Sequence, residues 1–550
     1  MSDLSLLSQL TIRLADADPP EALQAALREI VVESSLHMPC VATLCIHDPG
    51  LRWVDAPELE PGVALRVEAT VGQVAEELFD GEIVELESHY ASSSHFLTVR
   101  AFDRLHRLDR GRHARAFADI SDGDLLRRLA AEAGLEAEVA DDGPIIPHLF
   151  QANQSNLELL RQRAGARGQL LFVVRATLHC AAPALGEPVA LQWGQGLSEF
   201  RPHLTTLGQV GQVLARGWDP DEHREILGEA GPGQGAPAIG ERRAGGELAQ
   251  AAFGIAAAEL VADRPIRSQA AATALAQAVA DRRAGQLIEA EGRCRGNPRI
   301  SAGATARLSA LGDRYSGDYL VTAACHRSSA AGYFTELSVS GLSPHAPLQR
   351  LLPPPPPRVP PGLALAVVTD NQDPEGRCRV KLRLPWLAPD HSSDWVRVVA
   401  PGAGAERGLL LLPEVDDEVL VGFELGDLGQ PYVLGGLWSG HSAPPRPSDE
   451  LLGGGQVRRR LIRSRSGHQI LLDDDPSEGA ITIEDRAGNR IHLDTASNSL
   501  SIALKGDATI TAKGAIRLDA GGKLSLKGRG ISIDGGAGGV DIDGSTIDLN

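Results

Sequence analysis

The sequence predicts a mainly β protein: an α+β region, a small barrel of the OB type, and a C-terminal β-helix that three chains share. Three observations support this prediction. The segment LLPPPPPRVPPG at 351–362 contains seven prolines and separates two parts of the chain. Short alternating apolar runs with regular turn residues follow it. From Ile481 onward, apolar pairs recur at a spacing that settles near eight residues, which marks a repeat architecture.

Composition and length narrow the class of protein. A chain of 550 residues exceeds a single core, so several domains are expected. The formal net charge of −19 argues against a nucleic-acid-binding protein. No run reaches the roughly 18 apolar residues of a membrane span, and the start MSDLSLLSQL lacks a basic segment before an apolar core. Six scattered cysteines fit a reducing compartment, so we expect synthesis in the cytoplasm and no disulfide framework.

The region before the linker mixes strands and helices. EIVELESHY, HFLTVRAFDRL, DYLVTAACH and GYFTELSVS alternate at period two and predict strands. A helix is predicted at 121–134 with Ser121 as its N-cap, and Ser155 with Glu158 predicts a capping box at the start of another. The Ala-rich stretch 246–284 predicts two helices broken near Pro265. This combination is typical of an α+β region with two or more subdomains.

The proline-rich segment predicts an extended polyproline spacer. After it, LALAVVTDNQDPEGRCRVKLRLPW predicts two strands joined by a turn at Asp373–Gly376. DWVRVVAP, GLLLLPEVDDEVLVGF and QPYVLGGLW add further short strands. Four to five strands within about 80 residues favour a small closed barrel of the OB type.

The C-terminal repeat predicts an obligate, intertwined homotrimer. A repeat of eight residues suffices for one strand and one corner, too little for a single chain to enclose a core. If three chains each supply one wall, the Ile, Leu and Val faces meet around a shared axis, and Gly and Ala permit the corners. A disordered tail is the alternative, but disordered segments are depleted in β-branched apolar residues.

Four motifs precede the repeat: GRCRVKLRLPWL, WVRVVAPGAGAERGLLLLPEVDDEVLVGF, GDLGQPYVLGGLW and IRSRSGHQILLDDDPSEGAITIEDRAGNRIHLD. Together with the repeat, they resemble the spike proteins of contractile injection machines: VgrG of type VI secretion, phage baseplate spikes, and the spikes of extracellular systems. The resemblance runs almost continuously from 362 to 550. Before the linker, VRAFDRLHRLDRGRHARAFADIS and GDRYSGDYLVTAACH are similar, more weakly, to the hub domain of that family.

The resemblance implies a trimeric hub with two barrel-like subdomains, an OB-fold neck and a triangular β-helical needle. The domains implied are hub barrel-like subdomain 1 (1–115), an α/β insert of the hub (116–180), hub subdomain 2 with the Ala-rich helices (181–350), the polyproline linker (351–361), the OB-fold (362–440), the neck (441–479) and the needle (480–550).

By the same resemblance, we expect a structural spike of a phage-tail-like or type VI system. It would join inner tube and baseplate proteins to a cell-puncturing needle that carries a PAAR-like tip protein, and effector cargo could travel with it. The spike would be made in the cytoplasm, join the particle at the baseplate, and be released extracellularly or injected, touching a target membrane only during injection.

No catalytic, cofactor-binding or metal site is expected, and the protein is predicted not to be an enzyme. The carboxylates of PEVDDEVLVGFELGD favour a solvated turn over a catalytic pair, because they share one element (Glu414, Asp416, Asp417, Glu418). GGAGGVDID at 535–543 nearly matches a calcium-binding nonapeptide, but Val540 occupies the aspartate position. Neither GxSxG nor a P-loop is present.

The histidines, cysteines and arginines also favour structural roles. Cys325 and His326 fit strand packing, and Cys40 with Cys45 lacks a second pair of zinc ligands. The basic run VRRRLIRSRSGH at 457–468 has no interleaved aromatic, so charge compensation of DDD at 473–475 is favoured over nucleic-acid binding.

No histidine follows His492, which speaks against a tip that holds its own iron. We therefore expect a separate cap protein to dock on Ile547, Leu549 and Asn550. The competing hypothesis is a tailspike-like β-helix that binds or degrades polysaccharide. It requires exposed aromatics along the repeat, and 480–550 contains no Trp, Tyr or Phe. An enzyme within the hub is a third possibility, which a cell-wall hydrolysis assay would decide.

Overall fold

The computed structural model describes residues 9–548, apart from 72–73, 175, 183–186, 220–221, 223, 232–239, 341–361 and 387–391. The chain divides into two compact units, Met1–Ser442 and Ala443–Asn550. The predicted polyproline spacer at 351–361 lies outside the described residues. Among the helices that the structure describes, none has both the length and the apolar character required to cross a membrane.

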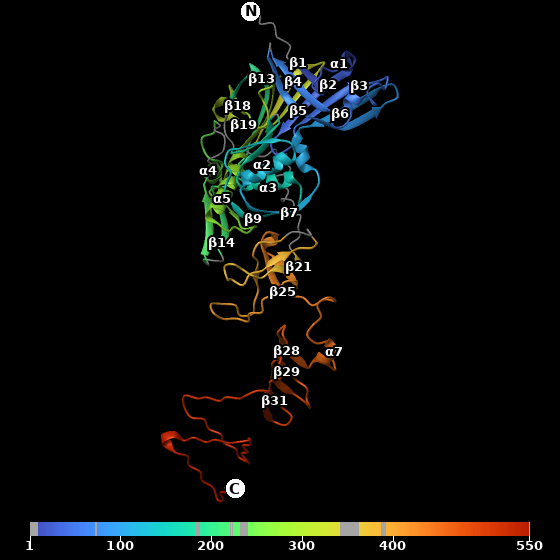
Figure 1. Ribbon diagram of the computed structural model, residues 1–550. Helices are drawn as coiled ribbons and strands as arrows, with labels where there is room; N and C mark the ends of the chain where they lie inside the picture. Colours follow the sequence, from blue (N-terminus) through green and yellow to red (C-terminus); the bar gives the residue numbers. More distant parts are fainter. Residues whose placement is uncertain are drawn as a thin grey trace, which may run out of the picture. The chain divides into compact units, whose positions relative to one another are not determined.

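One sheet of twelve strands is the largest sheet of the first unit (Figure 1). Neighbouring strands are mostly antiparallel, except that β12 runs parallel to both β13 and β18. In sheet order the strands are β1 (Gln9–Leu14), β4 (Ala64–Val71), β5 (Val74–Tyr90), β6 (His95–Phe102), β3 (Val41–His47), β2 (Leu27–Ser35), β19 (Gly317–Ser329), β18 (Thr305–Ser309), β12 (Val189–Trp193), β13 (Gly196–Leu204), β17 (Ile288–Arg295) and β20 (Gly332–Ser340).

Six of these strands close into a barrel. Strand β20 pairs with β17 and also with β19, so the order β19-β18-β12-β13-β17-β20 returns to its start. Leu197, Leu337 and Val339 are among the residues of its core. Closure removes the free edges that an open sheet would expose. The predicted mainly β class is confirmed.

The other six strands, β1 to β6, enclose a second core. Strands β3 and β6 alternate buried and half-buried residues along their whole length, which confirms the period-two prediction for HFLTVRAF. Strand β2 pairs with β19, and β20 contributes Tyr333 to this core. Strand β20 therefore contributes to both cores, and β19 links the two groups of strands by its pairing with β2.

The insert after β6 is an α+β layer with its own core. Ser121 Oγ accepts a hydrogen bond from the Asp124 amide, and Ser155 with Glu158 forms the predicted capping box. Both predicted helices are confirmed. The elements are β7 (His113–Ile120) paired with β9 (Ile146–Gln154), β8 (Glu136–Val139), β10 (Leu170–Val174) and β11 (Thr177–Ala181) in a second sheet, and helices α2 (Asp122–Glu132) and α3 (Asn156–Ala166).

The Ala-rich stretch forms two helices, α4 (Gly245–Phe253) and α5 (Gln269–Gly285), as predicted. A short strand that the sequence did not predict, β16 (Ala258–Val261), lies between them because it pairs in parallel with β14 (Gln212–Asp219). Helix α5 packs on β14 and β15 (Arg224–Ala230). A Cβ at Gly228 would lie 2.3 Å from the Ala272 backbone, so glycine permits this close approach.

The region after 361 forms a five-stranded sheet with a small aliphatic core. The turn at Asp373–Gly376 is present, with the Gly376 amide bonded to the Asp373 carbonyl. The apolar run at 408–412 does not form a strand as predicted: it lies in a loop that continues through Pro413, a residue without an amide donor, to the start of the strand at Glu418. In sheet order the strands are β22 (Lys381–Arg383), β21 (Leu363–Asp370), β24 (Glu418–Phe423), β25 (Pro431–Gly436) and β23 (Arg397–Val398).

The short helices and the first elements of the second unit complete the described structure. They are α1 (Glu21–Ala26), α6 (Gly312–Tyr315), the 3-10 turns Pro57–Leu59, Arg104–Asp109, Glu424–Gly426 and Gly536–Gly538, and, in the second unit, α7 (Ser448–Leu451), β26 (Leu452–Gly453) and β27 (Gln456–Val457).

Candidate assembly surface

The second unit contains an antiparallel sheet of five equal strands in sequence order. Each strand has five residues, and cross-strand partners are in continuous register. Gly467 and Gly488, both with positive φ, lie in two of the tight turns between strands. The strands are β28 (Arg459–Arg463), β29 (Gln469–Asp473), β30 (Ala480–Glu484), β31 (Arg490–Asp494) and β32 (Ser499–Ala503).

One face of this sheet is mostly aliphatic, and its aliphatic side chains are exposed. Directly paired residues share a face, so the register places nine Ile and Leu side chains in two rows across the strands. We call them the apolar rows. Their exposed fractions lie between 40% and 61%. The members are Ile462, Ile470, Ile483, Ile491 and Ile502 in one row, and Leu472, Ile481, Leu493 and Leu500 in the other.

The opposite face is more polar yet better covered. Thr482 is buried and shares a hydrogen bond of 2.9 Å with His492. Ser501 continues this face on β32, because it is the cross-strand partner of His492. A sheet with a partly covered polar face and an open aliphatic face has the reverse of the usual arrangement.

The basic run pairs with the acidic run, as the sequence predicts. Arg459 Nε lies 2.7 Å from Asp473 Oδ2, Arg458 lies 3.1 Å from Asp475, and Arg460 also pairs with Asp474. The antiparallel register of β28 and β29 sets Arg459 opposite Asp473, which brings the two runs together. Three arginines are thus used within the sheet and are not a free nucleic-acid surface.

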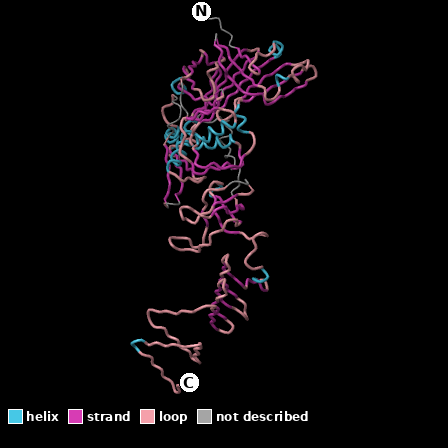
Figure 2. Tube along the Cα trace, viewed as in Figure 1, coloured by secondary structure: helices cyan, strands magenta, loops and turns pink. Residues whose placement is uncertain are grey.

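Beyond β32 the apolar pairs continue without strand pairing among the described residues (Figure 2). Their side chains are exposed, with Ile510 at 79%. Of the three residues predicted to dock a cap, Ile547 is exposed, whereas Leu549 and Asn550 lie outside the described residues. The Gly-rich segment at 535–543 contains a short 3-10 turn at Gly536–Gly538.

A stricter pattern than the apolar pairs runs through this part of the sequence. Every even-numbered position from 500 to 528 is Leu, Ile, Ala or Gly, while all charged residues of that stretch stand at odd positions. Alternate residues of an extended chain face opposite sides, so the two sets would lie on opposite faces wherever this segment is extended. This even-and-odd pattern is visible when residues are compared position by position and not as apolar pairs.

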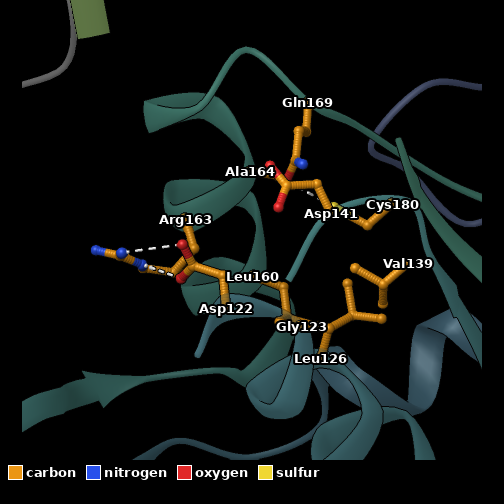
Figure 3. A pocket seen from close by; sticks show the side chains of 10 residues that line it. All are labelled: Asp122, Gly123, Leu126, Val139, Asp141, Leu160, Arg163, Ala164, Gln169 and Cys180. Atoms are coloured by element: carbon orange, nitrogen blue, oxygen red, sulfur yellow. Dashed lines mark hydrogen bonds and ion pairs between the residues drawn. The ribbon is translucent and has the colours of Figure 1, made fainter. Parts of the chain in front are cut away.

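In the first unit, polar side chains that line a small hollow beside the N-terminus of α2 form hydrogen bonds with one another (Figure 3). Arg163 donates two hydrogen bonds, of 2.7 and 3.1 Å, to the Asp122 carboxylate. The Cys180 thiol donates to Gln169 Oε1, and burial raises the pKa of this thiol to about 11. A protonated thiol is a poor nucleophile, so the hollow has the character of packing and not of a catalytic centre.

The remaining candidate residues have structural surroundings. The carboxylates at 414–418 form a turn in which the Glu414 amide donates to Asp417 Oδ2 at 2.8 Å. Within the described residues, no cluster of three or more His, Cys, Asp or Glu could hold a metal ion. His326 is buried in β19, where Nε2 and Nδ1 lie 2.8 Å from the Ile300 carbonyl oxygen and the Tyr333 hydroxyl. The predicted packing role of His326 is confirmed.

The buried His326 predicts that the stability of the twelve-stranded sheet depends on pH. Burial lowers the pKa of His326 to about 4, whereas an unfolded histidine titrates near pH 6.5. As the pH falls, the histidine of the unfolded chain therefore takes up a proton before that of the folded chain does. The neutral histidine contributes at most about 3 kcal/mol to the free energy of unfolding; this contribution is fully present above pH 6.5 and is lost as the pH falls towards 4. Denaturant unfolding at pH 7.5 and 4.5 should show a smaller pH dependence for His326→Gln than for the wild type; equal dependences would contradict this assignment.

The solved-structure comparison supports the fold. A structure of a Francisella PdpA–VgrG complex aligns with 91% of this chain and 89% of its own, with a TM-score of 0.55 at 9% sequence identity. At that identity the likeness concerns the fold alone. It extends over both the barrel strands and the later sheets, since it covers nearly the whole chain.

The sequence comparison gives spike proteins of Pseudomonas aeruginosa. The type VI secretion system spike protein VgrG2a is 28% identical over 155 residues, which is 26% of this chain and 18% of that protein. VgrG5 is 32% identical over 130 residues, 20% of this chain and 16% of that protein. The matches thus span less than a fifth of these relatives. They confirm the resemblance to VgrG-type spikes.

Two family models match separate parts of the chain. The type VI secretion system/phage-baseplate injector OB domain matches residues 364–438, the region of strands β21 to β25. The Alg8 N-terminal domain matches residues 22–329, which is more than half of the chain and includes most of both barrel cores. The chain therefore belongs to the Alg8 N-terminal domain family, and an injector OB domain follows that region.

Proposed function

We propose that this chain is a structural spike protein of a contractile injection system, and that three copies assemble through the apolar rows. The observation that carries the proposal is the aliphatic face of β28 to β32, which a single chain leaves open. Three such faces around a common axis would cover one another and bury their side chains. The alternating stretch from 500 to 528 would continue the same arrangement as an intertwined β-helix.

The proposal assigns a mechanical role to each region. Residues 1–350 would be a hub on the inner tube and baseplate, 362–440 an OB neck, and 480–550 a needle, with the cap on Ile547, Leu549 and Asn550. The relatives VgrG2a and VgrG5 are type VI secretion system spike proteins, which supports this role. That the similar VgrG was solved with PdpA supports the presence of partner proteins at such a spike. The chain would act as part of an injection particle and without catalysis.

The mass of the purified full chain tests the proposal. We expect sedimentation equilibrium to give three times the 58.1 kDa of one chain, with no single chains at micromolar concentration. The physical reason is that separation would expose all nine aliphatic side chains of each copy. A well-folded single chain with a β-rich spectrum at that concentration would contradict the proposal.

A further inference from the structure

The distribution of lysine in this chain is highly uneven. The chain has five lysines among 53 basic residues, and four of them fall within 505–527. Arg517 and Arg529 add to them. We call this set of six residues the cationic belt: Lys505, Lys513, Arg517, Lys523, Lys527 and Arg529.

The belt occupies a single face of its segment. All six residues stand at odd positions, opposite the even-numbered aliphatic and glycine positions, and all six are exposed. If the even face is buried between chains, the odd face remains at the surface of the assembly. The belt is thus available to a partner in the assembled protein.

Few acidic residues lie near the cationic belt to neutralise its positive charge. The acidic residues within 505–529 are Asp507 and Asp519, and Arg517 uses the second in an ion pair of 2.8 Å. Among the residues that the structure describes, none of the four lysines forms an ion pair. After Arg529 the charges are exclusively acidic, at Asp534, Asp541, Asp543 and Asp548. A positive band therefore stands out in a chain of net charge −19.

We propose that the cationic belt binds the anionic head groups of a lipid bilayer. This inference rests on the proposed function, because three chains would bring eighteen basic side chains to one girdle of the needle. Near an anionic leaflet each basic residue strengthens binding roughly fivefold, and the attraction fades within a Debye length. Such a surface needs no fixed geometry from the cation, which suits the mobile, strongly hydrated ammonium of lysine.

A nucleic acid is a poorer match for the same charge. Binding to single strands relies on aromatic side chains for stacking, and 480–550 contains none. Phosphate recognition with fixed geometry favours the planar fork of arginine, which this chain otherwise uses throughout. The belt departs from that usage and employs lysine.

Vesicle flotation with the full-length protein tests the inference. We expect binding to phosphatidylcholine vesicles that contain 30% phosphatidylglycerol, no binding to pure phosphatidylcholine, and loss of binding at high salt. The fourfold variant K505Q/K513Q/K523Q/K527Q should bind at least tenfold more weakly, whereas the fourfold Lys→Arg variant should bind like the wild type. As a control matched in charge, R201Q/R224Q/R299Q/R314Q changes four exposed arginines of the first unit and should leave binding unchanged.

Sedimentation of every variant separates this inference from the proposed function. If the protein is a trimer but binds anionic and neutral vesicles equally, the inference about the cationic belt is wrong and the spike proposal is unaffected. Equal binding by the wild type and the Lys→Gln variant, or binding to a DNA duplex in place of vesicles, likewise overturns it. A single chain that binds anionic vesicles through the four lysines supports the belt and contradicts the trimer. A further outcome is that the Lys→Gln variant aggregates while the wild type does not bind vesicles. In that case the lysines serve to protect strand edges from pairing with other chains, and the inference is wrong.

Discussion

Replacing Leu500 with aspartate is expected to convert the assembled protein into single chains. Leu500 belongs to the apolar rows on β32, and in the proposed trimer its three copies would face the shared interior. A buried carboxylate without a partner costs several kcal/mol, and here three would meet in one layer. Sedimentation equilibrium of Leu500→Asp at micromolar concentration should give the mass of one chain, with a smaller β signal from 500–528.

The neighbouring residue supplies the matched control. Ser501 follows Leu500 on the same strand, points to the opposite face and is likewise exposed in the single chain. Ser501→Asp introduces the same charge one position away and should leave the assembly intact. If both variants assemble alike, the apolar rows do not form the interface.

Replacing Tyr333 with alanine should destabilise both cores of the twelve-stranded sheet at once. Tyr333 is buried, lies in the core of β1 to β6, and extends from β20, a strand of the closed barrel. Removing a buried aromatic side chain from a core costs about 3–5 kcal/mol. Because one strand serves both cores, thermal unfolding of residues 9–340 should remain a single transition that shifts to lower temperature, as followed by calorimetry and limited proteolysis.

A conservative variant separates the contribution of the Tyr333 ring to stability from that of its hydroxyl group. Tyr333→Phe keeps the packed ring and removes only the hydrogen bond to His326, worth about 1 kcal/mol. Its transition should therefore lie close to that of the wild type. Two separate transitions in Tyr333→Ala, one of them unshifted, would show that the two cores unfold independently.

Local features of the fold were predictable because their causes are local. The capping box at Ser155 and Glu158 requires only residues three apart, and period-two alternation identifies β6 from its own sequence. The Arg459–Asp473 pair was predictable as charge compensation, since two opposite runs of charge stand close in the chain. On the assembly surface, the aliphatic repeat was visible from its spacing alone.

Other features depend on distant partners and could not be predicted. Strand β16 exists because β14, over 40 residues earlier, offers a free edge, and nothing in its own four residues requires a strand. The run at 408–412 has the composition of a strand but finds no neighbour to pair with. Likewise, the pairing of β2 with β19 joins residues almost 300 positions apart, beyond the reach of any local pattern.

Strand β20 contributes to both cores and β19 pairs with β2, which limits how this protein can change by recombination. A gene segment that encodes one barrel cannot be exchanged for a homologous one without altering strands on which the other core also depends. The sheet of β21 to β25, in contrast, pairs only with itself among the described strands. Crossovers between related genes should therefore survive after residue 340 more often than before it, and the two groups of strands should be inherited together.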